Sequence, residues 1–248
     1  MINRNLLIDI GNSNIKTGTG NSGITDIKNI KRFPYSKSDF KKDFENIFNE
    51  NYLNNNYDKT GISVLNDQHN DFIEKYILNK FKIRPVFINR KMKLPVTLKY
   101  SRSLGNDRIC NAVAASVKYN TKNTLIIDFG TATTFTLLSD NILIGGLILP
   151  GIKTSMLSLT ERTSLPEVKL TFPKSIINNT TIDNIRAGVL YQSLFSAERI
   201  IRETRKEYKG LFVIATGGYS KLISEKTGLI NITDRYLALK GINILISQ

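Results

Sequence analysis

The chain has 248 residues, of which 41% are hydrophobic and 9% aromatic, a composition typical of a folded protein with a substantial core and not of a disordered one. Its 35 basic and 21 acidic residues give a formal charge of +14, but the lysines are scattered and no nucleic-acid-binding motif is present. We therefore do not expect nucleic acid as a partner. The single cysteine, Cys110, excludes an intramolecular disulfide, and we expect it to be a buried free thiol.

In the first half of the chain, short runs of Ile, Leu and Val alternate with longer amphipathic segments, which predicts an α/β fold. The predicted strands are 5–11, 14–20, 24–33, 60–65 and 84–90. The predicted helices are 36–52, 67–81 and 107–120. In the first helix, Phe40, Phe44 and Phe48 recur on one face. His69, the only histidine, is expected at a polar surface position and not in a metal site.

The second half repeats this order of strands followed by alternating helices and strands. Strands are predicted at 123–130, 131–140, 142–149 and 211–218, and helices at 152–163, 182–208, 220–225 and 233–247. The repetition predicts a duplicated α/β architecture with domains 1–117 and 118–248.

The segment "LLIDIGNSNIK", residues 6–16, has the residue types of a phosphate-binding loop. Gly11 allows a tight turn whose backbone N–H groups can surround an anion, and Lys16 adds a cation for a phosphate oxygen. Asp9, at the end of the strand, can hold Mg²⁺ through water. The alternative is a hairpin turn that only reverses the chain.

A second segment, "DFGTATT" at residues 128–134, repeats this pattern with Asp128 and Gly130. Two such hairpins, one from each half, could hold the phosphates of a nucleotide in a cleft between the halves. Gly217 and Gly218 in "ATGG" follow a later strand, where bare backbone would let a flat base lie against them. An isolated Gly-Gly pair could equally be a turn.

The order of these motifs resembles that of the acetate/sugar kinase, Hsp70 and actin superfamily. The resemblance implies duplicated ribonuclease H-like (actin-like ATPase) domains with a nucleotide cleft between them. Within the superfamily the chain resembles the type III pantothenate kinases. This narrower resemblance covers nearly the whole chain and also rests on "GNDR" at 105–108, "GGLILPG" at 145–151, "TSLP" at 163–166 and "TIDNIRAG" at 181–188.

The resemblance implies an ATP-dependent kinase that converts pantothenate to 4′-phosphopantothenate in the first step of coenzyme A biosynthesis. It implies a first ATP loop made of Asp9, Ile10, Gly11, Asn12, Ser13, Asn14, Ile15 and Lys16, with Thr131 as a second contact. It implies Asp107 as the catalytic base and a pantothenate pocket formed by Tyr100, Gly105, Asn106, Asp107, Arg108 and Thr181. It also implies that Asp128 binds a monovalent cation, K⁺ or NH₄⁺. Finally, it implies a homodimer with the active site near the interface.

The chemistry of these residue types agrees with such roles, since an Asp can accept a proton from a substrate hydroxyl and an Arg can hold a carboxylate or phosphate. The alternatives are that Asp107 only stabilises a helix N-terminus and that Arg108 forms a salt bridge there. Two other functions stay open: a non-catalytic accessory or regulatory homologue, and a kinase acting on a sugar or carboxylic acid. With no secretory leader and no apolar tract long enough for a bilayer, we expect a cytoplasmic protein without a membrane partner.

Overall fold

The computed structural model describes residues 4–23, 25–52 and 56–248. The chain divides into two compact units, the first made of residues 1–120 together with 237–248 and the second of residues 121–236. The C-terminal helix, α7 (Leu237–Ile246), therefore belongs to the first unit although it follows the second in sequence.

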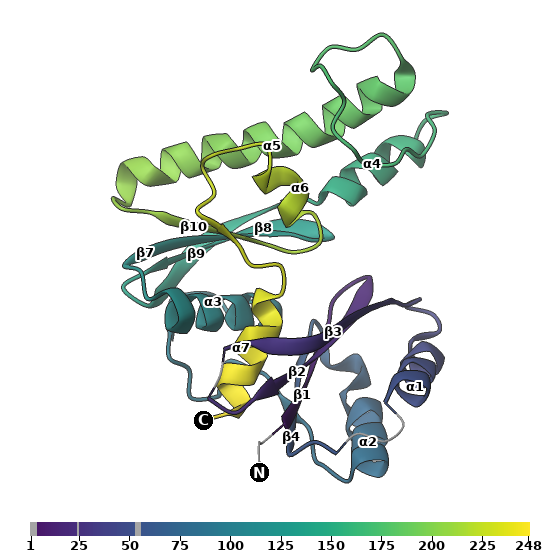
Figure 1. The fold of residues 1–248 in the computed structure, drawn as a ribbon, viewed down its shortest axis with the longest axis vertical. Coiled ribbons are helices and arrows are strands. Elements are labelled where there is room, and N and C mark those ends of the chain that lie inside the picture. The colour runs from purple at the N-terminus through teal and green to yellow at the C-terminus, as the bar shows by residue number, and fades with distance from the viewer. Residues whose placement is uncertain (1–3, 24, 53–55) are drawn as a thin grey trace. The chain divides into compact units, whose positions relative to one another are not determined.

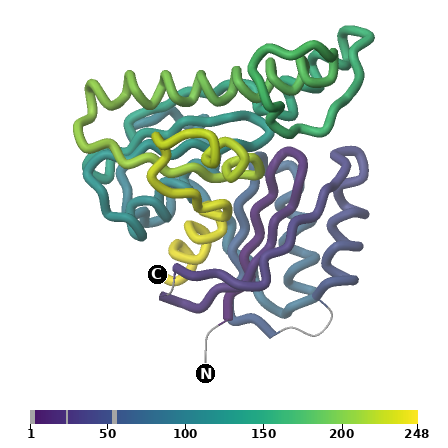
Figure 2. The backbone as a smooth tube through the Cα atoms, turned by 45° about the horizontal axis from the view of Figure 1, so that its top comes forward, coloured from purple at the N-terminus to yellow at the C-terminus, as the bar shows by residue number. Residues whose placement is uncertain are grey.

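The first unit contains a five-stranded sheet in the order β3-β2-β1-β4-β5. These strands are β1 (Arg4–Ile10), β2 (Asn14–Asn21), β3 (Ile27–Pro34), β4 (Lys59–Val64) and β5 (Val86–Phe87). The first three form an antiparallel meander, visible as the purple strands in Figure 2, and β4 and β5 are added in parallel. The strand predicted at 84–90 is thus reduced to two residues.

Two helices, α1 (Phe40–Asn51) and α2 (Asn70–Phe81), pack against one face of this sheet (Figure 1). The predicted stripe of Phe40, Phe44 and Phe48 is confirmed, since the three rings are at most 3% exposed. His69 ends a short 3₁₀ turn, Asp67–His69, and is half-buried because its ring stacks on Phe40 at a centroid distance of 4.3 Å.

The other face of the sheet is covered by α7, which packs on α3 (Asn106–Tyr119). Side chains alternate along a strand, so Gly61 of β4 faces away from the core that contains Ile62. A Cβ on Gly61 would lie 2.6 Å from Ile242 of α7, and one on Gly241 would lie 2.7 Å from the Cα of Cys110. These glycines allow α7 to approach both β4 and α3. The remaining element of this unit is β6 (Thr97–Leu98).

The strands of the second unit are β7 (Asn123–Phe129), β8 (Ala132–Ser139), β9 (Ile142–Pro150), β10 (Phe212–Thr216) and β11 (Ile232–Thr233). They are neighbours in the order β9-β8-β7-β10-β11, with an antiparallel meander followed by two parallel strands. This is the order and direction of β3-β2-β1-β4-β5 in the first unit. The predicted duplicated ribonuclease H-like fold is confirmed by this equivalence.

The long helix α5 (Thr181–Glu207) runs along the sheet of the second unit, together with α4 (Ile152–Thr160) and α6 (Ser220–Ser224) (Figure 1). Alternate residues of β7, namely Leu125, Ile127 and Phe129, pack into the core that α5 covers. The N-terminus of α5 is capped by Thr180, whose hydroxyl accepts a hydrogen bond from the backbone N–H of Asp183 at 3.2 Å.

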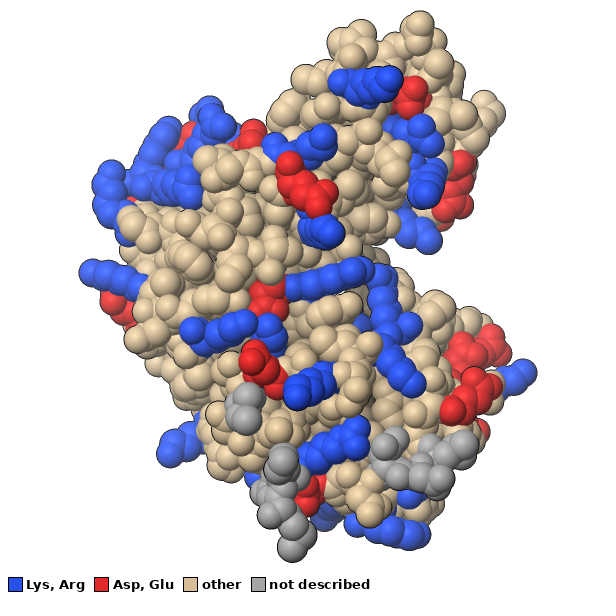
Figure 3. Space-filling model, viewed as in Figure 1, with Lys and Arg blue, Asp and Glu red and all other residues tan. Residues whose placement is uncertain are grey.

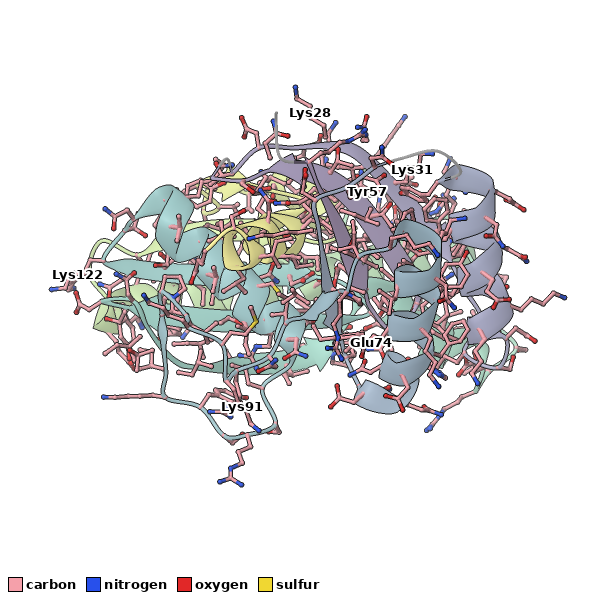
Figure 4. All side chains as sticks on the ribbon, turned by 90° about the horizontal axis from the view of Figure 1, so that it is seen from below. Lys28, Lys31, Tyr57, Glu74, Lys91 and Lys122 are labelled. Atoms are coloured by element: carbon pink, nitrogen blue, oxygen red, sulfur yellow. The ribbon has the colours of Figure 1, made fainter. Side chains whose placement is uncertain are left out.

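Basic side chains are spread over the visible surface and are interrupted by acidic ones (Figure 3). Lys28, Lys91 and Lys122 are exposed and point outward from separate segments (Figure 4). This distribution agrees with the absence of a dense basic tract in the sequence. None of the helices in the described ranges is long and apolar enough to cross a membrane.

Candidate active site

The predicted first phosphate loop is the turn between β1 and β2. Asp9 is 3% exposed at the end of β1 and is paired in register with Lys16, whose Nζ lies 3.0 Å from its Oδ2. The turn is closed by a hydrogen bond from the backbone N–H of Gly11 to the carbonyl of Asn14 at 3.0 Å. The pairing with Lys16 offsets the cost of burying the Asp9 carboxylate at this position. Asn12 and Ser13, at the tip of the turn, are exposed.

The N-terminus of α3 lies at the same edge of the sheet as this loop. Asn106 donates a side-chain hydrogen bond to the carbonyl of Val64 at 3.1 Å, which ties the helix start to the end of β4. Because β4 runs parallel to β1, with Val64 opposite Ile10, the helix start is near the end of β1 as well. Asp107 is in the first turn of α3, where its Oδ1 accepts the backbone N–H of Arg108 at 2.8 Å.

The negative charges of Asp9 and Asp107 both act on the thiol of Cys110. Cys110 is a fully buried free thiol, as predicted. Burial raises the pKa of this thiol well above its usual value, and the negative charges of Asp9 and then Asp107 raise it further. Both carboxylates therefore lie close enough to the Cys110 thiol to raise its pKa.

This shift leads to an expected result for thiol chemistry. Alkylation requires the thiolate, and a raised pKa lowers the thiolate fraction of Cys110 at pH 8 relative to the unfolded chain. We expect iodoacetamide to label the native protein at least about 100-fold more slowly than the urea-unfolded protein. The rates can be followed by intact mass. Equal rates in the two states would contradict the burial of this thiol.

Arg108 and Tyr100 form the other part of the predicted acceptor pocket. The Arg108 guanidinium is 4.9 Å from the centre of the Tyr100 ring, and its Nη1 donates to the Tyr100 hydroxyl at 3.2 Å. Arg108 is only 5% exposed, so its charge acts in a poorly solvated environment. The sequence did not predict the role of Arg90, which donates to the carbonyls of Tyr100 (3.3 Å) and Ser101 (2.8 Å) and so holds this segment.

The second loop, in the second unit, also joins two antiparallel strands after a strand-end Asp, but its turn is one residue shorter than that of the first. Asp128 occupies the sixth position of β7 as Asp9 does in β1, and Gly130 donates its backbone N–H to the carbonyl of Ala132 at 3.2 Å. Thr131 is exposed at the tip of this turn, and its carbonyl accepts hydrogen bonds from the N–H of Gly151 (3.1 Å) and the hydroxyl of Thr154 (2.6 Å). The start of α4 therefore holds the loop in place.

The "ATGG" segment lies against this second loop. Gly217 has φ = +90°, a left-handed conformation that side chains rarely adopt, and a Cβ there would lie 2.8 Å from the carbonyl of Phe129 and even closer to the Asp128 carboxylate. The sequence pattern alone left this Gly-Gly pair open as a simple turn. In the structure it is a close contact between two strand ends, β7 and β10.

The predicted site residues are thus distributed over both units. Asp107 and Arg108 lie at the start of α3, and Tyr100 lies in the segment before it and is bonded to Arg108. Asp107 shares the neighbourhood of Cys110 with Asp9. Asp128 and Thr131 lie in the second unit with Gly217, and Thr181 is the exposed first residue of α5.

The donor atoms available for metals are oxygens. Among the residues that the structure describes, no three His, Cys, Asp or Glu side chains converge into a metal cluster. Mg²⁺ in nucleotide sites commonly uses one or two carboxylates together with phosphate oxygens and water, and Asp9 fits this need. Near Gly217, the carboxylate of Asp128 and the carbonyl of Phe129 are hard oxygen donors of the kind that K⁺ accepts.

Comparison with known families adds to this geometry. Residues 5–203 match the model of the type III pantothenate kinase family. The chain is 33% identical over 249 residues to the type III pantothenate kinase of Petrotoga mobilis, a match that covers 96% of this chain and 95% of that protein.

Solved structures support the fold. A conserved Baf family protein from Campylobacter jejuni superposes with a TM-score of 0.61 at 21% identity, covering 97% of this chain and 96% of that one. An inorganic polyphosphate/ATP-glucomannokinase from Arthrobacter sp. strain KM gives a TM-score of 0.55 at 13% identity, covering 99% and 98%. At these identities the likeness shows a shared architecture and no more.

Proposed function

This chain belongs to the type III pantothenate kinase family, and we propose that it transfers the γ-phosphate of ATP to the 4′-hydroxyl of pantothenate. The products are 4′-phosphopantothenate and ADP, and the reaction begins coenzyme A biosynthesis. The single observation that carries this proposal is the family match over residues 5–203, which includes both loops and the start of α3.

In this proposal Asp107 accepts the proton of the pantothenate hydroxyl as its oxygen attacks the phosphorus. Two observations support the assignment. The carboxylate stands in the first turn of α3, and it shares the neighbourhood of Cys110 with Asp9 of the phosphate loop. Phosphoryl transfer depends mainly on positioning and charge neutralisation, and the base adds a place for the proton of the attacking hydroxyl.

Pantothenate also needs contacts that hold it beside this base. Gly105, Asn106 and Arg108 would line its pocket together with Tyr100 and Thr181. The buried Arg108 guanidinium supplies a planar set of donors suited to the pantothenate carboxylate, and Tyr100 helps to fix its orientation by accepting a hydrogen bond from Nη1.

ATP would be held through its phosphates by residues 9–16 and by Thr131. Asp9 would take part in holding Mg²⁺, and Asp128 a monovalent cation, K⁺ or NH₄⁺. When bound, these ions would neutralise the negative charge on the phosphates. The chain itself orients the phosphates through the backbone of the two turns and through Lys16.

We further propose that the protein acts as a homodimer in the cytoplasm, where ATP is available, with the active site near the interface. A non-catalytic accessory role is not favoured, since Asp107 and both loops are retained. Nucleic acid is not part of the proposal because the basic residues are scattered along the sequence and no nucleic-acid-binding motif is present.

The proposal predicts pantothenate-dependent release of ADP by the purified protein in the presence of Mg²⁺ and K⁺. Turnover should fall when K⁺ is replaced by a large organic cation, because Asp128 would lose the ion it holds. ADP can be measured with a coupled assay, and the phosphorylated product by mass spectrometry. Absence of turnover with pantothenate, together with turnover on a sugar or another carboxylic acid, would show that pantothenate is not the phosphate acceptor.

A further inference from the structure

We propose that Tyr35 is a positioning residue of the first phosphate loop, which it holds through the carbonyl of Gly11. The hydroxyl of Tyr35 donates a hydrogen bond to this carbonyl oxygen at 2.7 Å. The inference rests on the proposed function in one respect, namely that residues 9–16 bind the phosphates of ATP.

The bond to Gly11 determines where the next backbone N–H points. A trans peptide is planar, and its C=O and N–H groups point in opposite directions. The carbonyl of Gly11 and the N–H of Asn12 belong to one such peptide. Because Tyr35 holds the carbonyl on its own side, the Asn12 N–H is directed away from Tyr35. The N–H of Gly11 is already bound to Asn14, so both peptides of Gly11 are fixed.

The pairing of β2 with β3 and the packing against α1 determine the position of Tyr35. Pro34, the last residue of β3, pairs with Asn14, the first residue of β2, so the next residue, Tyr35, emerges beside the turn. Its ring packs edge-on against Phe40 at a centroid distance of 5.3 Å and an angle of 79°. Phe40 is 3% exposed and stacks in turn on His69. The packing of these rings therefore fixes the direction in which the Tyr35 hydroxyl points.

A pocket of about 110 Å³ adjoins the loop, and Gly11, Asn12, Tyr35, Phe40 and His69 are among the residues that line it. This volume can admit water if the Tyr35 hydroxyl is removed, so water can take over part of its hydrogen bond. Burial also raises the pKa of Tyr35, so the hydroxyl keeps its proton and remains a donor at neutral pH. We therefore expect only a moderate loss of ATP affinity when the Tyr35 hydroxyl is removed.

The test compares Tyr35→Phe with Tyr76→Phe by calorimetric titration of a non-hydrolysable ATP analogue with Mg²⁺. Tyr76 is a control in the same unit, because its hydroxyl also donates a hydrogen bond of 2.7 Å, in this case to Oδ1 of Asn49 and away from the loop. Tyr35→Phe should weaken binding of the analogue about 3- to 10-fold, the usual effect of one neutral hydrogen bond. Adenosine, which lacks phosphates, should bind both variants as it binds the wild type.

Three results would overturn the inference: unchanged affinity of Tyr35→Phe for the analogue, an equal loss in Tyr76→Phe, or an equal loss for adenosine. Because the measurement needs no pantothenate, the two proposals can fail separately. If the wild type binds the analogue but does not phosphorylate pantothenate, the proposed kinase activity is wrong. The binding measurement still tests the role of Tyr35 in that case. If the wild type phosphorylates pantothenate and Tyr35→Phe binds the analogue normally, only the role of Tyr35 falls.

Discussion

Replacing Asp107 with asparagine is expected to lower kcat for pantothenate phosphorylation by about two to four orders of magnitude, the usual contribution of a general base. Asparagine keeps the Oδ1 atom that accepts the backbone N–H of Arg108, so the start of α3 should be retained. What is lost is the charge and the ability to take a proton. The measurement is steady-state turnover at saturating ATP and pantothenate.

The structure shows that Asp107 also has a structural role like the one considered as an alternative, because its carboxylate accepts the backbone N–H of Arg108 in the first turn of α3. The two roles are compatible, and a control separates them. Asp71 is an exposed aspartate in the first turn of α2, and Asp71→Asn removes a helix-terminal charge without touching the loop. Each change should cost no more than about 1 kcal/mol of stability. If Asp107→Asn were as active as Asp71→Asn, Asp107 would not be the base.

Replacing Gly217 with alanine is expected to damage both nucleotide binding and the stability of the second unit. The residue has φ = +90°, and a Cβ would lie 2.8 Å from the backbone of Phe129 and closer still to the Asp128 carboxylate. Backbone strain and overlap together should lower the free energy of unfolding by about 2–4 kcal/mol. The ends of β7 and β10 would have to separate, and kcat/KM for ATP should fall about 100-fold or more.

Gly228→Ala is the matched control, because Gly228 lies in the same unit and a Cβ there would meet nothing within 4 Å. Thermal unfolding and titration with the ATP analogue should be compared for the two variants. A Gly217→Ala protein with the stability and ATP affinity of Gly228→Ala would contradict the close contact described between β7 and β10.

Much of the local structure was predictable because it depends on residues close together in sequence. Short runs of Ile, Leu and Val predicted the strands, and the repeat of Phe40, Phe44 and Phe48 predicted the buried face of α1. The duplicated Asp-x-Gly pattern predicted equivalent turns, and β1–β2 and β7–β8 form them. Short-range patterns of this kind record which side of a strand or helix is buried, so they can be read without knowing the fold.

Contacts between distant segments were decided only by the tertiary structure. Nothing around Tyr35 indicates its bond to Gly11, and nothing around Arg90 indicates that it holds the carbonyl of Tyr100. The glycines give the clearest case. Gly217 must be glycine because of Phe129, and Gly241 because of Cys110, which brings the C-terminal helix α7 onto the first unit. The residue types determine which chemistry each loop can perform. Strand order and helix packing determine which residues come into contact, because steric exclusion acts between atoms that are close in space, whatever their separation in sequence.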